Sequence, residues 1–209
     1  MNSNVANMLL KILAPTLDYN QGPVGRLPFA NEYNGQSNFT EDKVKKLIAI
    51  MKNDWDSYET SWDFEVCPFY LDGYCRSSIE PAYDDLNEHR KNIVLEAKQL
   101  EEANNSKFIE IYGIEGELRP DVSLNEITLN CNPNYRYQGQ NDIIKHEVIL
   151  KEDTIKELIS YAVGCMMGRY SLNESGLIYA DSGNEGFDLS RYKTFPADED
   201  GIIPITGED

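Results

Sequence analysis

Basic residues are scarce in this chain of 209 residues. Nineteen lysines and arginines stand against 36 aspartates and glutamates, which gives a formal net charge of −17. A module that binds nucleic acid by itself normally presents a basic face. The composition therefore argues against an independent nucleic-acid-binding module, although it is compatible with a local basic strip. An acidic solvated surface is the ordinary interpretation of such a charge.

Residues that bind metals are also few. The chain has four cysteines and two histidines, and no CxxC pair occurs among the cysteines. A structural zinc site normally uses closely spaced pairs of these ligands, so we expect no metal site. Long apolar runs are absent, and we recognise neither a signal peptide nor a transmembrane segment. We therefore expect a cytoplasmic protein with reduced thiols and no membrane partner. The cysteines and histidines are Cys67, Cys75, Cys131, Cys165, His89 and His146.

The clearest helical pattern runs from Asp153 to Tyr170. Hydrophobic residues make up 41% of the chain, and in this stretch they recur at the i, i+3, i+4, i+7 spacing of one helical face. Thr154 and Glu157 have the spacing of a capping box at its start. Gly164 and Gly168 leave one side without side chains, where another backbone can approach closely. We predict that this stretch is the central amphipathic helix of the core.

A longer helix is predicted from Ile79 to Tyr112. Ser78 precedes it as the expected N-cap, and Gly113 ends it. At about 1.5 Å per residue it is roughly 50 Å long. A helix of this length with a narrow apolar seam usually packs against a second helix or bridges two bodies. The residues expected to be buried along the seam are Leu86, Ile93 and Leu100.

Two further helices are expected in the N-terminal part of the chain. One follows a cap at Ser3 or Asn4 and ends before Pro15. The other opens at Phe39-Thr40, with Thr40 as its N-cap. Its expected buried face consists of Val44, Leu47, Ile48 and Met51.

Lysines on the opposite side of this last helix form the most basic patch of the chain. They are the candidate contacts to DNA phosphates, although a solvated helix face is the more common explanation of such a patch. These residues are Lys43, Lys45, Lys46 and Lys52.

Few strands are predicted. The strand candidates are Ile127–Cys131 and Leu177–Ala180, which are short apolar runs bounded by turn residues. The segment from Pro15 to Phe29 is rich in proline and glycine, so we expect short extended pieces joined by turns. The predicted fold class is α+β and mainly helical, with a long helix, a central amphipathic helix and a few short strands.

An acidic stretch from Asp54 to Phe64 contains both tryptophans of the chain. Catalysis would require paired carboxylates near a base or a metal, and no second cluster in the sequence supplies them. We therefore expect a structural role. In this interpretation Trp55 and Trp62 fix a loop to the domain, and the acids cap neighbouring helices.

The stretch Asn132-Pro133-Asn134-Tyr135 is close to the base-binding motif of amino-directed DNA methyltransferases. That motif reads Asn or Asp, Pro, Pro and an aromatic residue, and it holds the amine of the flipped base. Here Asn134 takes the place of the second proline, and no Gly-rich turn after a strand precedes it to bind S-adenosylmethionine. We therefore predict a type I turn, and no catalytic or cofactor-binding residue in this chain.

Three stretches together resemble the PglX-type adenine-specific DNA methyltransferases of the BREX phage-defence system, and more loosely the type IIG restriction–modification enzymes. Their order and spacing agree with that family, and the resemblance covers nearly the whole chain. The stretches are DWDSYETSWDF at 54–64, NSKFIEIYGIEGELRPDVSLNEITLNCNPNYRY at 105–137, and IKELISYAVGCMMGRYSLNESGLIYA at 155–180 with the later FPADEDGIIPI at 195–205.

The resemblance implies two parts. Residues 1–34 resemble the end of a methyltransferase catalytic domain, and residues 35–209 resemble a helical connector domain with a turn-rich C-terminal tail. In the family the cofactor-binding and base-binding motifs come earlier, so no catalytic residue is carried over. The implied activity of the parent enzyme is methylation of adenine N6 in DNA with S-adenosylmethionine. Its implied partners are DNA and other phage-defence proteins.

Two functions from different classes remain open at this point. The first is a non-catalytic connector that positions the catalytic and target-recognition parts of the parent on DNA. The second is an acidic protein-interaction module or DNA mimic, for which the net charge of −17 is the support. A mimic requires acids in two regular rows, whereas a connector requires an apolar interface at its ends.

Overall fold

The structure is a computed structural model that describes residues 3–14, 21–28, 37–71, 73–74, 76–139, 143–181 and 185–198. Within these ranges the chain forms helices and turns, and no β-strand occurs. The expectation of a mainly helical chain is confirmed, and the α+β class with its short strands is wrong. In this part of the chain no helix has both the length and the apolar character needed to cross a membrane. The elements are α1 (Asn4–Leu13), α2 (Gln21–Val24), α3 (Ser37–Asp56), η1 (Pro68–Tyr70), α4 (Ile79–Tyr112), η2 (Leu124–Glu126), α5 (Pro133–Arg136), α6 (Ile143–Met166) and η3 (Leu189–Arg191).

The first strand candidate, Ile127–Cys131, is a buried turn. The backbone N–H groups of Asn130 and Cys131 donate to the Asp54 carboxylate over 2.6 and 3.0 Å. Because a distant acid satisfies these donors, they are not free to pair with a neighbouring strand. The second candidate, Leu177–Ala180, lies outside any helix or strand. The apolar residues of the first candidate, Ile127–Cys131, are buried, as they would be in a strand. The pattern therefore predicted their burial correctly and their backbone pairing incorrectly.

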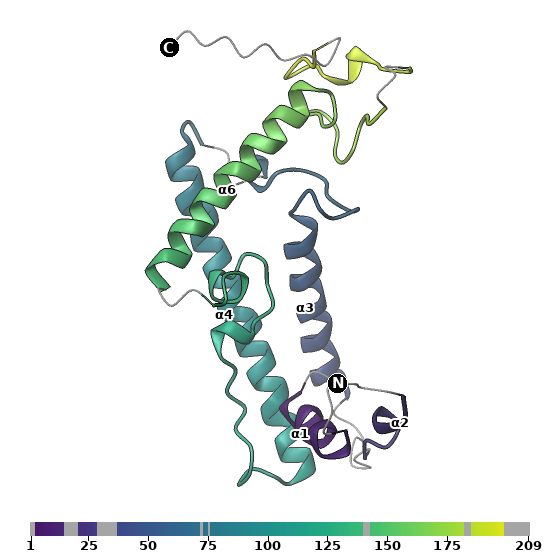
Figure 1. The fold of residues 1–209 in the computed structure, drawn as a ribbon, viewed down its shortest axis with the longest axis vertical. Helices are drawn as coiled ribbons and strands as arrows, with labels where there is room; N and C mark the ends of the chain where they lie inside the picture. Colours follow the sequence, from purple (N-terminus) through teal and green to yellow (C-terminus); the bar gives the residue numbers. More distant parts are fainter. Residues whose placement is uncertain are drawn as a thin grey trace.

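The longest helix of the described residues is α4, and α1, α3 and α6 pack along it, so we call it the spine of the molecule. Its bounds match the helix predicted over residues 79–112, with Ser78 before it and Gly113 in the left-handed conformation after it. Figure 1 shows α1 beside the C-terminal end of α4, α2 next to α1 on the side away from α4, and α6 crossing the N-terminal half of α4. Since α1 and α6 contact different halves of α4, the helix holds the N-terminal and C-terminal segments of the chain apart.

The buried stripe of α4 differs from the predicted seam. Leu86 is 3% exposed, as expected, whereas Ile93 and Leu100 are only partly buried. Val94 and Ala97 lie deeper than these two residues. A strict seven-residue repeat drifts around a straight helix, so burial follows the 3.6-residue period when the partners are several separate segments.

Two hydrophobic clusters lie along this spine. The first joins the N-terminal half of α4 to α6 and to the segment after α3. The second joins the middle of α4 to α3 and to the turn over residues 127–131. The first contains Phe64, Cys67, Phe69, Ala82, Tyr83, Leu86, Tyr161, Cys165 and Tyr170; the second contains Leu47, Val94, Ala97, Val122, Ile127, Leu129 and Cys131.

The start of α1 is fixed locally and the helix is tied to α4. The hydroxyl of Ser3 accepts from the N–H of Ala6 over 3.2 Å, which confirms the predicted N-cap. The side-chain oxygen of Asn105, a buried residue of α4, accepts from the N–H of Asn4 over 3.0 Å.

Next along the chain, α2 forms a helical turn at residues 21–24, where extended pieces were expected. Residues 15–20 and 29 of the same predicted segment lie outside the described part.

The expectations for α3 are only partly met. The helix begins at Ser37, so the prediction of Thr40 as its N-cap is wrong. Leu47 is buried, but Ile48 is 60% exposed. The face expected to be buried is therefore largely open, since α4 covers only one strip of α3.

Both tryptophans of the acidic stretch point to solvent. Trp55 is 52% exposed and Trp62 is fully exposed, so neither fixes the loop to the domain as predicted. Tyr58 and Phe64 are the buried aromatic residues of this stretch. Asp54 accepts from the backbone of a turn and not from the start of a helix, so the expected helix-capping role is wrong for this acid.

The prediction for α6 is right about the helix and wrong about its start. The helix begins at Ile143, well before Asp153, so Thr154 and Glu157 lie inside it and form no capping box. The pattern misled because residues three apart share a helical face anywhere along a helix. The end is a Schellman motif, in which Gly168 donates to the Cys165 carbonyl over 3.1 Å.

Aromatic rings, and not a second backbone, cover the glycine side of α6. A Cβ at Gly164 would lie 2.7 Å from Cδ2 of Tyr170, and a Cβ at Gly168 would lie 2.6 Å from Cε2 of Phe187. The predicted close approach is therefore present, with a different partner. Both distances are too short for any real side-chain atom, so only glycine fits without movement of the ring.

We expect Gly168→Ala to be more destabilising than Gly186→Ala. Both glycines have a left-handed φ, +74° and +80°, so a Cβ strains the backbone at either position. Only Gly168 adds a clash, because nothing lies within 4 Å of a Cβ at Gly186. The free energy of unfolding from urea titration should fall by about 1–3 kcal/mol more for Gly168→Ala. Equal losses in the two variants would contradict the ring contact at Gly168.

Candidate functional site

The lysines proposed as DNA contacts lie on α3, where three of them form ion pairs with acids of this chain. The pairs are exposed, so each contributes little to stability. They nevertheless offset much of the positive charge that a phosphate would meet. The role of these lysines in binding DNA stays a prediction. The pairs are Lys45–Glu41, Lys46–Glu96, Lys52–Asp56 and Lys52–Asp63, and Lys43 completes the set.

The side chain of Asn132 serves the fold. It is fully buried, and its oxygen accepts from the N–H of Asn134 over 3.1 Å at the start of α5. Its amide nitrogen donates to the carbonyls of Leu124 and Ile127 over 2.7 and 2.8 Å. The predicted turn is thus a single helical turn capped by Asn132, and the amide that would hold a flipped base has both of its N–H groups engaged.

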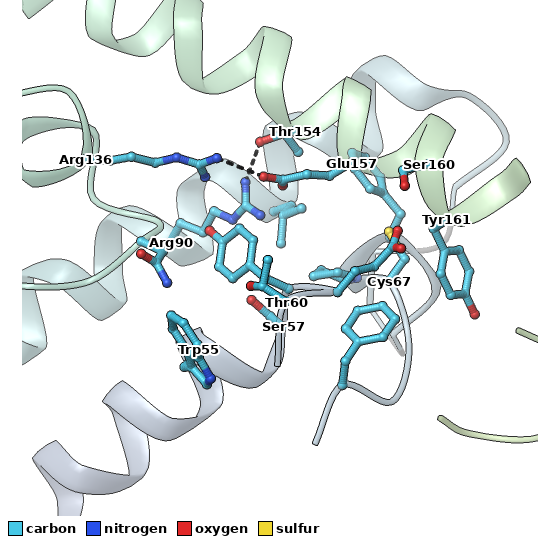
Figure 2. Close-up of a pocket in the computed structure, with 17 residues that line it drawn as sticks. Trp55, Ser57, Thr60, Cys67, Arg90, Arg136, Thr154, Glu157, Ser160 and Tyr161 are labelled. Atoms are coloured by element: carbon cyan, nitrogen blue, oxygen red, sulfur yellow. Dashed lines mark hydrogen bonds and ion pairs between the residues drawn. The ribbon is translucent and has the colours of Figure 1, made fainter. Parts of the chain in front are cut away.

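A cavity of about 420 Å³ lies between the C-terminal end of α3, α4 and α6. Its floor includes Arg90 from α4 and Thr154 from α6, both buried. Trp55, Thr60 and Ser160 also line it and are exposed, which places them at its mouth. Figure 2 shows Arg90 and Arg136 on one side of the cavity, with Thr154 and Glu157 of α6 next to their guanidinium groups. Its volume lies within the range of small-molecule sites, about 300–1,000 Å³.

Arg90 is a buried cation, and its charge interacts with that of the nearby Glu157 carboxyl. Its residue is 6% exposed, and Nη1 donates to Oγ1 of Thr154 over 2.8 Å. In the part of the chain that the structure describes, no carboxylate lies at ion-pair distance from it. Burying an unpaired charge is costly, so buried arginines are normally paired. Arg90 therefore presents further N–H donors at the cavity wall.

Arg136, from the end of α5, is paired. Its Nη2 lies 3.0 Å from Oε1 of Glu157 and 3.6 Å from Oδ2 of Asp153, and its guanidinium lies 5.5 Å from the ring centre of Tyr58. Burial raises the pKa of the Glu157 carboxyl above its ordinary value, which the guanidinium of Arg136 only partly offsets. Glu157 thus joins α6 to α5, in place of the capping role expected from the sequence.

The cavity wall includes the buried thiol of Cys67. Burial raises the pKa of the Cys67 thiol to about 11, so at neutral pH this residue is a protonated thiol and a poor nucleophile. Among the described residues, no group of three or more His, Cys, Asp or Glu side chains could hold a metal ion.

Sequence reasoning missed the charged residues of this cavity. A signal for Arg90 was available, because it lies four residues after Leu86 and four before Val94, within the apolar stripe of α4. A charged residue at such a position is rarely buried without a reason. Arg136 and Glu157 carried no comparable signal, since their pairing joins segments that are separate in the sequence.

Comparison with known proteins finds relatives along the whole chain. It is 38% identical over 216 residues to the adenine-specific methyltransferase BrxX of Escherichia coli O9:H4 (strain HS), covering 100% of this chain and 17% of that protein. It is 30% identical over 212 residues to the adenine-specific methyltransferase PglX of Lacticaseibacillus casei (strain Zhang). That alignment covers 100% of this chain and 16% of the relative. No family model matches. The predicted resemblance is confirmed, and the chain spans about one sixth of the length of these relatives.

Proposed function

We propose that this chain is a non-catalytic connector region of an adenine-specific DNA methyltransferase related to BrxX and PglX. The observation that carries the proposal is the alignment of the whole chain with about one sixth of two such enzymes. In this role the chain keeps the catalytic and target-recognition parts of the parent enzyme at a set distance on DNA.

The arrangement around α4 supports this role. A helix of 34 residues spans about 50 Å. It is tied to α1 through Asn105 near one end and packs against α6 through Leu86 near the other. A helix that is packed at both ends transmits a fixed distance better than a flexible linker does. The side chains of Ile12 in α1 and Leu177 after α6 are 70% and 62% exposed, which suits an apolar contact at each end.

A chimera tests the proposal. In BrxX of Escherichia coli, the span aligned with this chain is replaced either by this chain or by a Gly/Ser linker of equal length. We expect the first chimera to retain adenine methylation and the second to lose most of it, because a flexible linker does not fix the spacing. S-adenosylmethionine binding serves as the control, since an intact catalytic part should bind the cofactor in both chimeras. Equal methylation by the two chimeras would contradict a positioning role.

We expect the chain alone to bind no S-adenosylmethionine. Among the described residues no glycine lies in a turn between a strand and a helix, which is the usual start of such a site. The amide of Asn132 is also engaged by the carbonyls of Leu124 and Ile127. Calorimetry with the cofactor should therefore detect no binding. Micromolar binding that a folded Asn132→Ala variant loses would show that the base-binding interpretation was rejected wrongly.

We expect the chain alone to bind duplex DNA weakly. The net charge is −17, and three of the four lysines on α3 already pair with acids. Any binding should fall steeply between roughly 50 and 200 mM salt in a fluorescence anisotropy titration. Replacing the four lysines by glutamine should remove what remains. Nanomolar, salt-resistant binding would instead identify the chain as a recognition domain.

A further inference from the structure

The cavity between α3, α4 and α6 gathers hydrogen-bond donors that lack acceptors. Among the described residues, Arg90 makes one side-chain hydrogen bond, to Thr154, and no carboxylate lies at ion-pair distance from it, while Glu157 lies near enough for the two charges to interact. Nη1 of Arg136 and the hydroxyl of Tyr58 are buried, and neither has a hydrogen-bond partner in the same part of the chain. Buried donors are normally satisfied. Because these donors come from three separate segments, their meeting at one cavity indicates a ligand group rich in acceptor oxygens.

The remaining walls restrict the ligand further. The aromatic residues Tyr58, Phe69 and Tyr161 line the cavity. The ring of Tyr161 already stacks on Tyr170, and the Arg136 guanidinium lies over the ring of Tyr58, so Phe69 is the ring that offers a flat apolar surface to a planar group. Two carboxylates, Glu59 and Glu157, also line it and would repel a bare anion. Oε1 of Glu59 is buried without a hydrogen-bond partner within the described residues, so it can accept from an amine. The lining therefore favours a ligand that combines an anionic group and a ring with an exocyclic amine.

We propose that this cavity binds a small ligand that joins a planar, amine-bearing ring to a phosphate, which is the chemistry of a nucleoside monophosphate. The phosphate lies against Arg90 at the floor, where its oxygens accept the unused guanidinium donors. The ring packs against Phe69, and its amine donates to Glu59. This binding is independent of the connector role, and it involves no chemical step.

Calorimetry of the full chain with matched probes tests the proposal. AMP and CMP supply all three features; adenosine and cytidine lack the phosphate; inorganic phosphate lacks the ring; and UMP matches CMP without the amine. We expect AMP or CMP to bind at least tenfold more tightly than its nucleoside, than inorganic phosphate and than UMP. The absence of AMP and CMP binding at millimolar concentration would overturn the proposal.

Variants of the chain locate the binding. Ser160 is exposed at the mouth of the cavity, so Ser160→Trp should block entry without disturbing the core. Ser106, exposed on α4 and away from the cavity, supplies the matched control Ser106→Trp. We expect at least a tenfold loss of nucleotide affinity for Ser160→Trp and none for Ser106→Trp. An unchanged affinity for Ser160→Trp would place the nucleotide elsewhere and overturn the proposal.

The role of Arg90 is tested by Arg90→Gln, which should weaken nucleotide binding at least tenfold while leaving the helical circular dichroism spectrum unchanged. If this variant does not fold, the comparison of Ser160→Trp with Ser106→Trp decides. A single-stranded oligonucleotide that competes for the cavity more tightly than AMP and CMP would overturn the small-ligand assignment in favour of a nucleic-acid strand.

Discussion

Asn132→Ala is expected to lower the free energy of unfolding by about 3 kcal/mol, because three hydrogen bonds of about 1 kcal/mol each are lost. The bonds join the buried amide to the N–H of Asn134 and to the carbonyls of Leu124 and Ile127. The two carbonyls would lose their side-chain donors, and α5 would lose its cap. Urea titration followed by circular dichroism measures the change.

Asn134→Ala is the matched control for this prediction. Asn134 lies in the same helical turn and is only partly buried, so its replacement should change stability by less than about 0.5 kcal/mol. A loss below about 1 kcal/mol for Asn132→Ala would show that its amide does not hold this turn together. The residue would then be available for another role, and the base-binding interpretation of this stretch would return.

Leu86→Ala is expected to lower the free energy of unfolding by about 2–5 kcal/mol, because it opens a cavity in the first hydrophobic cluster. Leu86 is 3% exposed and packs where α4 meets α6 and the segment after α3. Leu95, on the same helix and 48% exposed, provides the control, and Leu95→Ala should cost far less. Thermal and urea unfolding of the two variants give the comparison.

Ile93→Ala should fall between these two variants. The seven-residue seam predicted for α4 would place Ile93 as deep as Leu86, but the structure leaves it only partly buried. A loss for Ile93→Ala as large as that for Leu86→Ala would support the strict seam and contradict the burial seen along α4.

The ends of α4 could be predicted from the sequence because their causes are local. Gly113 ends the helix through the left-handed conformation of its own backbone, so the pattern of neighbours is sufficient there. Ser78 holds the predicted N-cap position in extended backbone, although its side chain makes no capping hydrogen bond. The start of α6 could not be predicted in this way. The helix begins at Ile143 and continues past Asp153, where a cap-like pair of residues occurs inside it.

The strand candidate Ile127–Cys131 failed for a related reason. Its apolar residues are buried, as the pattern indicated, but burial does not specify what the backbone bonds to. Here the partner is the Asp54 carboxylate, 76 and 77 residues away in the sequence. No short-range pattern identifies such a partner.

The sequence by itself determined the mainly helical class, the long helix with both of its ends, and the resemblance to PglX-type methyltransferases. These depend on composition, on helical periodicity and on matches between sequences, which need no knowledge of contacts. Only the tertiary structure decided the cavity, because its charged groups come from distant segments. Arg90 and Thr154 are 64 residues apart in the chain and 2.8 Å apart in space. Such a contact follows from how α6 packs across α4, and packing depends on the whole chain at once.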